Sequence, residues 1–303
     1  METGTTAGEV AAPEGEHYDS EEAARLVEFS IRKYRRAHRN YESKHPEIFN
    51  PVEQGRLREE LELAIDAVRT QRRPLRALDL GCGSGNVTRH LFELGAEVIA
   101  ADVSPEFLGQ IEARFAASGR VSPLRINGQE LGEIASESLD LVCVYSVLHH
   151  VPNYLAMVDE ACRTLRPGGV LYLDHEANDN FYDKTSCFWG LMREVEQRRI
   201  EGRGWWNPDV RRWQRYLKPS KYVTRVRQIF DPAYPWNVEG DIHTWKLKRI
   251  EWDRIEVRLA RQGFDVVRRN DYLVYSAEYP EDIWARYEGR CTNMRLLSAR
   301  KIA

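Results

Sequence analysis

The stretch LDLGCGSGNV, residues 78–87, follows a short apolar run and precedes a predicted helix. Its glycines, Gly81, Gly83 and Gly85, form a GxGxG turn, in which bare backbone can approach a ligand closely. A dinucleotide-binding turn instead reads GxGxxG, and Asn86 stands where its third glycine would be. The stretch therefore predicts a cofactor site between a strand and a helix, and it does not favour a pyrophosphate site.

Acidic residues end the first two predicted strands. Asp79 stands two residues before the first glycine of the turn, and Asp102 closes the second strand. A carboxylate at the carboxyl end of a parallel strand can accept hydrogen bonds from both hydroxyls of a ribose. These features favour a ligand that has a ribose and an adenine but no phosphate over NAD.

Strand and helix patterns alternate through this part of the chain. Buried strands are predicted at residues 75–80, 96–104, 121–129, 139–148 and 170–176. Helices are predicted between them, at residues 86–95, 105–119 and 153–169. Such alternation gives right-handed crossovers and a doubly wound parallel sheet covered on both faces, which is an α/β fold.

Four motifs in this order, LDLGCGSG, AADVS, SLDLVCVYSVLHHVPN and TLRPGGVLYLDHE, make residues 75–175 resemble the class I S-adenosylmethionine-dependent methyltransferases of small-molecule type. The resemblance returns in a helix–strand–strand pattern at residues 251–301. It implies a Rossmann-like, seven-stranded sheet whose last strand is antiparallel and inserted between the fifth and sixth. It also implies S-adenosylmethionine as the cofactor.

The resemblance assigns cofactor contacts to the carboxyl ends of the first four strands. The glycines of the turn would lie against the methionine part, Asp79 would orient the turn and the amino group, and Asp102 would bind the ribose. The adenine would lie along Val103. The family often has an acidic residue after the third strand, whereas this chain has Asn127, Gly128 or Gln129 in that place. The floor beneath the sulfonium would be formed by Tyr145 and Ser146.

Histidines at the ends of the fourth and fifth strands are the candidate catalytic residues. His149, His150 or His175 could remove a proton from an attacking hydroxyl or amine, because the pKa of histidine lies near neutrality. The alternative is that they pack the turns in which they stand. Methyl transfer also often needs no base, since the sulfonium is already a good electrophile and in-line positioning can dominate.

The chain divides into five predicted regions. They are a disordered tail at residues 1–17, an N-terminal helical segment at 18–73, the cofactor-binding core at 74–175, a mainly helical lid inserted after the fifth strand at 176–250, and the C-terminal part of the core sheet at 251–303. The lid holds six of the eight tryptophans and more Lys and Arg than Asp and Glu. Its candidate substrate contacts are Glu176, Trp205, Trp206 and Arg211. The alternative is a lid with a purely structural role.

Composition excludes several other classes of protein. The formal net charge of the 303 residues is −3, so no general basic surface attracts nucleic acid or anionic membrane. The N-terminus does not resemble a signal peptide, and no stretch reaches the apolar length of a bilayer span. The five cysteines are widely spaced, which predicts reduced thiols, a cytoplasmic location and no metal site.

Together these features predict methyl transfer from S-adenosylmethionine to a small-molecule acceptor with an anionic or aromatic part, with a mild preference for an oxygen atom over nitrogen or carbon. One alternative is an RNA or nucleotide methyltransferase, whose binding would weaken steeply with salt. Another is a protein that binds the cofactor without transferring its methyl group, such as a regulator or a rearrangement enzyme.

Overall fold

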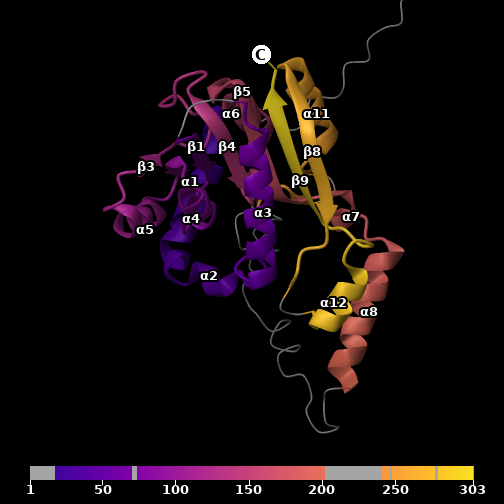
Figure 1. Ribbon diagram of the computed structural model, residues 1–303. Helices are drawn as coiled ribbons and strands as arrows, with labels where there is room; N and C mark the ends of the chain where they lie inside the picture. The colour runs from indigo at the N-terminus through magenta and orange to yellow at the C-terminus, as the bar shows by residue number, and fades with distance from the viewer. Residues whose placement is uncertain (1–17, 70–73, 202–240, 246–247, 277–278, 303) are drawn as a thin grey trace, which may run out of the picture.

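A computed structural model describes residues 18–69, 74–201, 241–245, 248–276 and 279–302. Its main sheet has seven strands in the order β3-β2-β1-β4-β5-β9-β8 (Figure 1). The strands are β1 (Arg76–Leu80), β2 (Glu97–Asp102), β3 (Val121–Arg125), β4 (Leu139–Tyr145), β5 (Leu165–Ala177), β8 (Phe264–Tyr272) and β9 (Met294–Lys301). The predicted seven-stranded α/β sheet is therefore confirmed.

The strand that ends the chain lies inside the sheet. β9 pairs antiparallel with β5 on one side and with β8 on the other, whereas the pairs among β1 to β5 are parallel. This is the inserted antiparallel strand that the resemblance implied. The carboxyl ends of β1, β2, β4 and β5 consequently meet at one edge of the sheet, at the lower end of the strands in Figure 1.

Helices cover both faces of the sheet. The helices that pack on the sheet are α3 (Pro51–Ala67), α4 (Asn86–Glu93), α5 (Pro105–Phe115), α6 (Tyr154–Thr164) and α11 (Trp252–Arg261). They are preceded in the chain by α1 (Ser20–Ala37) and α2 (Tyr41–Lys44). One core joins the sheet to α3 and α4 through residues such as Leu57, Leu61 and Leu91. A second core joins it to α6 and α11 through residues such as Met157 and Ile255.

Local signals in the sequence mark several of these helices. Ser104 caps α5, where its hydroxyl accepts a hydrogen bond from the Phe107 amide and Pro105 takes the first helical position, as predicted. Gly95 follows α4 at a φ of +88°, a conformation that favours glycine. The predicted boundary between the helix and strand near residue 170 is wrong, since α6 ends at Thr164 and β5 already begins at Leu165.

The described part of the predicted lid contains α7 (Asp179–Tyr182), α8 (Ser186–Glu201) and a short antiparallel pair, β6 (Thr244–Trp245) with β7 (Lys248–Arg249). Helix α8 packs against α12 (Glu281–Tyr287) beyond the lower end of β8 (Figure 1). Trp205, Trp206, Arg211 and the predicted tail at residues 1–17 lie outside the described residues.

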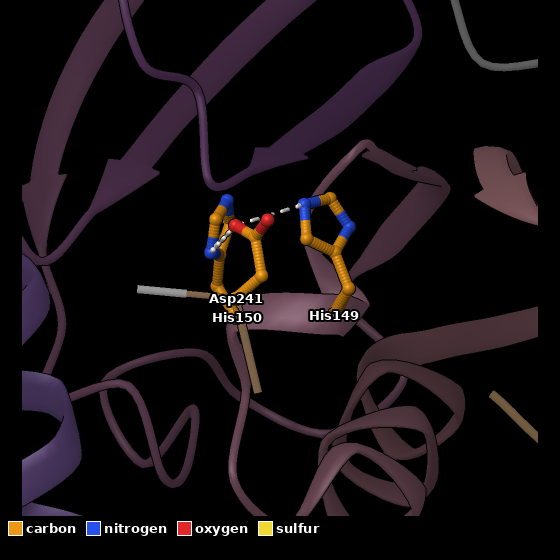
Figure 2. A group of neighbouring side chains, drawn as sticks. All are labelled: His149, His150 and Asp241. Carbon is orange, nitrogen blue, oxygen red and sulfur yellow. Dashed lines mark ion pairs between the residues drawn. The ribbon is translucent and has the colours of Figure 1, made fainter. Parts of the chain in front are cut away.

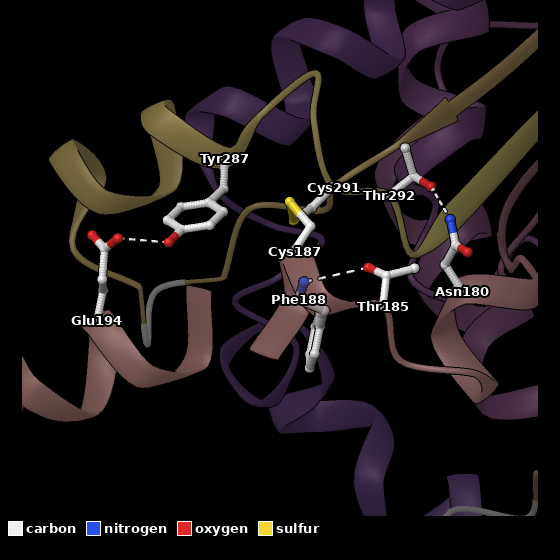
Figure 3. The surroundings of a disulfide bond; sticks show 8 residues. All are labelled: Asn180, Thr185, Cys187, Phe188, Glu194, Tyr287, Cys291 and Thr292. Atoms are coloured by element: carbon white, nitrogen blue, oxygen red, sulfur yellow. Dashed lines mark hydrogen bonds between the residues drawn. A yellow bond between two sulfur atoms is a disulfide. The ribbon is translucent and has the colours of Figure 1, made fainter. Parts of the chain in front are cut away.

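A disulfide joins α8 to the segment after α12. Cys187 and Cys291 are bonded across 104 residues of sequence, and the Tyr287 hydroxyl donates a hydrogen bond to Glu194 of α8 at 2.5 Å beside them (Figure 3). The prediction that all five cysteines are reduced is therefore wrong for these two. It failed because pairing depends on tertiary proximity, which spacing alone does not reveal. The cytoplasmic location, which rested partly on it, stays a prediction.

The three remaining cysteines, Cys82, Cys143 and Cys162, are free and buried. Burial raises the pKa of each of these thiols, to about 12 for Cys162. They are therefore packing residues rather than nucleophiles. None of the helices in the described ranges combines the length and apolarity that a membrane span requires.

Candidate functional site

The glycine turn is tied to the end of β2. The amides of Gly81 and Cys82 both donate to the Ala101 carbonyl, at 2.8 and 3.0 Å. Gly81 has a φ of +75°, and a Cβ atom there would lie 2.5 Å from a methyl carbon of Val147. The positive φ and the close approach of Val147 both favour a residue without a Cβ atom. The first glycine of the motif is therefore required for the shape of the turn, before any ligand is considered.

The other two glycines of the turn differ in what surrounds them. A Cβ atom at Gly85 would lie 2.6 Å from Ile111 of α5, so this glycine allows the turn to pack against that helix. A Cβ atom at Gly83 would meet nothing within 4 Å, although the residue has a φ of +48°. Gly83 therefore faces open space, which is what a cofactor lying on the turn requires.

Asp102 holds the turn in place from β2. One carboxylate oxygen accepts a hydrogen bond from the Gly83 amide at 2.9 Å, and the other accepts from the Ser104 amide at 2.8 Å. Burial raises the pKa of Asp102. Since each carboxylate oxygen has two lone pairs, both can still accept from a ligand hydroxyl.

Asp79 is also buried at the end of β1. The Thr88 hydroxyl donates to it at 2.5 Å, and burial, assisted by the nearby charge of Asp102, raises the pKa of Asp79 to about 7. A cationic amino group placed beside this carboxylate would favour its ionised form. Asp79 is therefore suited to the ammonium group of a methionine moiety.

Two adjoining cavities flank the turn. The first, which we term the glycine-turn cavity, is lined by residues that include Gly81, Gly83, Asp102, Val103 and Gly128. The second shares Gly81 and Gly83 with the first and is also lined by Asp79, Ser84, Asn86 and Tyr145.

Buried polar atoms around the second cavity test whether S-adenosylmethionine fits here. The hydroxyl of Ser84 and both polar atoms of the Asn86 side chain are buried without a hydrogen-bond partner among the described residues. Buried groups of this kind normally have a partner, so these atoms suit the polar amino-acid end of a ligand. The residues present therefore fit the nucleoside in the glycine-turn cavity and the methionine part beside Asp79.

Of the three residues predicted to lie near the adenine, one lines the glycine-turn cavity. Gly128 lines the glycine-turn cavity, and a Cβ atom at this position would lie 2.9 Å from Val103. The Asn127 side chain instead closes its own turn by accepting from the amides of Gln129 and Glu130, at 2.8 and 3.1 Å. Among the described residues of this turn, Asn127 and Gln129 are thus outside the cavity wall.

Substituting Gly83 by alanine tests whether the open space belongs to the cofactor. We expect Gly83→Ala to weaken binding of S-adenosylhomocysteine at least about tenfold, because the added methyl would occupy space that the ligand needs. Gly119→Ala is the matched control, since Gly119 also has a positive φ, +64°, and open surroundings but lies in another turn. Both variants should lose a similar stability, about 1–2 kcal/mol, from the left-handed backbone. Equal affinities by calorimetry would contradict this placement.

Backbone strain marks the edge of the sheet beside the glycine turn. Ser146 follows β4 with a φ of +57°, and His175, near the end of β5, has a φ of +59°. The Ser146 amide is held by the Asp174 carbonyl at 2.9 Å. Strained backbone at non-glycine residues is often kept at functional sites, and here both residues line the same cavity.

That cavity, which we term the histidine cavity, has a volume of about 370 Å³, within the range of small-molecule sites. It brings together the three predicted catalytic histidines and Glu176 from the sheet edge, and it adds residues from the N-terminal helices and from the chain near residue 241. Its lining residues include Lys33, Tyr34, Tyr41, Lys44, Ser146, His149, His150, His175, Glu176, Phe181, Tyr182 and Asp241.

Glu176 fixes His149 rather than facing the cavity freely. It is 1% exposed and accepts hydrogen bonds from the amides of Val147 and Leu148, at 2.8 and 2.6 Å. Its second oxygen lies 2.8 Å from Nδ1 of His149. Because a carboxylate accepts, this contact places a proton on Nδ1 and leaves Nε2 as the basic nitrogen of the neutral ring.

A buried charged network lies beneath His175. Arg56 of α3 donates to Asp174 at 2.9 Å and to Glu53 at 2.9 and 2.5 Å. Burial opposes ionisation of Glu53, but hydrogen bonds from Arg56 and His175 lower its pKa to about 2. The Tyr145 hydroxyl donates to Glu53 at 2.8 Å and lies 3.2 Å from Nδ1 of His175. His175 is therefore held by buried partners on one side.

Sequence reasoning identified Tyr145 and His175 of this network as site residues. It did not identify Glu53, Arg56, Asp174 or Asp241. Asp174, inside the apolar run VLYLDHE, was the available signal, since a carboxylate in a buried strand requires a partner. Its partner Arg56 comes from a helix far away in sequence. The sequence around Asp241 does not distinguish it from the acidic residues that commonly lie on protein surfaces. Its position beside the histidines results from the tertiary fold.

The chain is similar to known methyltransferases over many of the residues that form this site. A protein-family profile described as "Methyltransferase domain" matches residues 78–173, which hold the glycine turn, Asp102 and the histidine pair. A ubiquinone biosynthesis O-methyltransferase of Sinorhizobium medicae is 32% identical over 129 residues, covering 41% of this chain and 52% of that protein. One from Xanthomonas campestris pv. campestris is 35% identical over 101 residues, covering 32% and 41%. The chain thus spans about half the length of the curated relatives it matches, or less.

Among solved structures, the chain is similar to one in a complex between the Haloferax volcanii Trm112 methyltransferase activator and a methyltransferase. The TM-score is 0.51 at 18% sequence identity, with 91% of this chain and 98% of that chain covered. This likeness supports the fold alone.

Proposed function

Residues 78–173 of this chain form a class I S-adenosylmethionine-dependent methyltransferase domain, and from that premise we propose that the protein methylates a hydroxyl oxygen of a small aromatic acceptor. When bound, S-adenosylmethionine would supply an activated methyl group on its sulfonium. The residues of this chain would position the two reactants and accept the proton of the hydroxyl.

The main support for this proposal is that the glycine-turn cavity and the histidine cavity share a wall. Tyr34, Tyr41, Ser146 and His150 line both. A nucleoside held by Asp102 and an acceptor held beside the histidines would therefore meet at this wall. Holding two reactants in line can dominate the catalysis of a direct displacement.

The chemistry of the histidine cavity supports the class of acceptor. Tyr34, Tyr41 and Phe181 offer aromatic faces for a planar ring, and Lys33 and Lys44 offer positive charge for an anionic substituent. The matched relatives are named for O-methylation in ubiquinone biosynthesis, which favours oxygen as the methylated atom. We therefore propose a phenol or catechol that carries a carboxylate.

His149 is the residue to which we assign proton removal. Its Nδ1 is held by Glu176 at 2.8 Å, and it lines the cavity together with His150. A histidine oriented by a buried carboxylate resembles the base–carboxylate pair of many hydrolases. His175, held by Tyr145 and Tyr272 at 3.2 and 3.3 Å, is assigned a positioning role instead.

The proposal is tested by incubating the full chain with S-adenosylmethionine and a panel of mono- and dihydroxybenzoates. Mass spectrometry should detect S-adenosylhomocysteine together with a methyl ether. His149→Gln should lower kcat about 10²–10⁴-fold, the usual contribution of general base catalysis. His38→Gln is the control, because His38 lines neither cavity and hydrogen-bonds the Arg35 carbonyl. Methylation at nitrogen or carbon, or undiminished turnover by His149→Gln, would contradict the assignment.

A further inference from the structure

We propose that His149, His150 and Asp241 form a binding site for a divalent transition-metal ion of the zinc, cobalt or manganese type. One ligand atom from each of the three lies within 4.8 Å of the others. Figure 2 shows the Asp241 carboxylate between the two imidazole rings, 3.3 Å from Nδ1 of His150 and 4.0 Å from Nε2 of His149.

The spacing suits ligands around one ion. Zinc binds imidazole nitrogen at about 2.0–2.1 Å, so two tetrahedral ligand atoms lie roughly 3.3 Å apart. The His150–Asp241 distance of 3.3 Å already agrees with this value. The His149–Asp241 distance of 4.0 Å is about 0.7 Å longer, and the three ligand atoms lie within 4.8 Å of one another, so binding requires the His149 ring to move toward the other two ligands.

Backbone contacts hold Asp241 at the histidine pair. The amides of Ile242 and His243, directly after it, both donate to the His149 carbonyl, at 2.8 and 3.1 Å. Nε2 of His243 lies 3.0 Å from the Val151 carbonyl, which fixes this segment against the turn that follows the histidine pair. These hydrogen bonds join the segment after Asp241 to the turn that holds His149, and they thereby place the Asp241 carboxylate beside the histidine pair.

Each histidine is oriented by a partner on its other ring nitrogen. Glu176 holds Nδ1 of His149 at 2.8 Å, and the Tyr34 hydroxyl lies 3.0 Å from Nε2 of His150. Metal-binding histidines almost always make such a second contact, which fixes the tautomer and raises the basicity of the ligating nitrogen. Here the ligating nitrogens would be Nε2 of His149 and Nδ1 of His150, the two that face Asp241.

The donor set selects the class of metal. Two imidazoles and one carboxylate suit zinc and its first-row neighbours, whereas magnesium and calcium prefer oxygen ligands. Three protein ligands also leave coordination positions open to the histidine cavity, which all three residues line. If the proposed function holds, a bound ion would take over the role assigned to the free Nε2 of His149, because an acceptor hydroxyl bound to the ion would lose its proton more readily. The sequence analysis predicted no metal site from the spacing of the cysteines, and it did not consider Asp241, which is remote from the histidine pair in sequence.

Cobalt(II) is the probe for this site. Chelator-treated full-length protein without a histidine tag should bind one equivalent of Co²⁺, with the visible absorption of a low-symmetry site. Zn²⁺ should abolish that absorption, and excess Mg²⁺ should not. Asp241→Asn and His150→Gln should each weaken binding more than about 100-fold, and Glu176→Gln about 10–100-fold, as expected for loss of a group that orients a ligand. His38→Gln should bind as the wild type does.

Two results would overturn the proposal: no cobalt absorption in the wild type, or unchanged cobalt binding in Asp241→Asn. S-adenosylhomocysteine titrations of the same samples separate this failure from failure of the proposed function. Cofactor binding and methylation without metal binding would reject the metal site alone. Metal binding that depends on Asp241 would support the site even if no hydroxybenzoate were methylated. Asp241→Asn is suited to this comparison because Asp241 does not line the glycine-turn cavity.

Discussion

Replacing Asp102 by alanine is expected to weaken S-adenosylhomocysteine binding by about 30- to 1000-fold, or roughly 2–4 kcal/mol. We propose that the carboxylate accepts hydrogen bonds from the two ribose hydroxyls. Hydrogen bonds to a charged acceptor are stronger than those between neutral groups. It also holds the Gly83 amide at 2.9 Å, so its removal releases the glycine turn as well. Isothermal titration calorimetry at fixed pH measures the change.

Two further variants separate the ligand contact from a general loss of structure. Asp66→Ala removes an exposed carboxylate of α3 and should leave affinity unchanged. Asp102→Asn retains one accepting oxygen and should fall between the wild type and Asp102→Ala. If Asp102→Ala binds S-adenosylhomocysteine as tightly as the wild type, the ribose does not lie at the end of β2.

Replacing Arg56 by methionine is expected to destabilise the protein by about 3–5 kcal/mol, because it leaves buried carboxylates without their cation. Asp174 is fully buried and Glu53 is 2% exposed, and Arg56 donates to both. The guanidinium also lies over the Tyr272 ring, 3.9 Å from its centroid, so packing is lost together with charge. Urea denaturation followed by circular dichroism measures the free energy of unfolding.

Arg58 provides the matched control on the same helix. Its ion pairs with Glu62 and Glu93 are at 3.1 and 3.3 Å, but all three side chains are at least 41% exposed. Exposed pairs contribute about 0–1 kcal/mol, so Arg58→Met should shift the unfolding curve little. Similar losses in the two variants would mean that the network beneath His175 is not what stabilises this part of the fold.

The sheet could be predicted from the sequence because its signals are local. The apolar run before the glycine turn, the acidic residue that ends β2 and the cap formed by Ser104 each act within a few residues. The position of β9 inside the sheet has no local signal, and only the resemblance to a known family predicted it. The early start of β5 at Leu165 was missed, because Pro167, Gly168 and Gly169 are normally signs of a turn.

Candidate site residues could be predicted from the sequence only where they stand at or just after the end of a predicted strand. Asp79, Asp102 and His175 lie at or near the carboxyl ends of their strands, Ser146 follows β4 directly, and His149 and His150 stand in the turn after it. Glu53 and Asp241, by contrast, reach the site through contacts with residues far away in sequence, such as the hydrogen bond from Tyr145. The disulfide was missed for the same reason. Long-range pairing depends on the fold as a whole, and one sequence without relatives does not reveal it.

A crystal structure of the protein with S-adenosylhomocysteine would show directly whether the cofactor lies on the glycine turn with its sulfur toward the histidine cavity. We expect the ribose hydroxyls within hydrogen-bonding distance of Asp102, the amino group near Asp79, and the sulfur facing the wall formed by Ser146 and His150. Ligand density at another place, or a sulfur atom directed away from the histidine cavity, would contradict this placement.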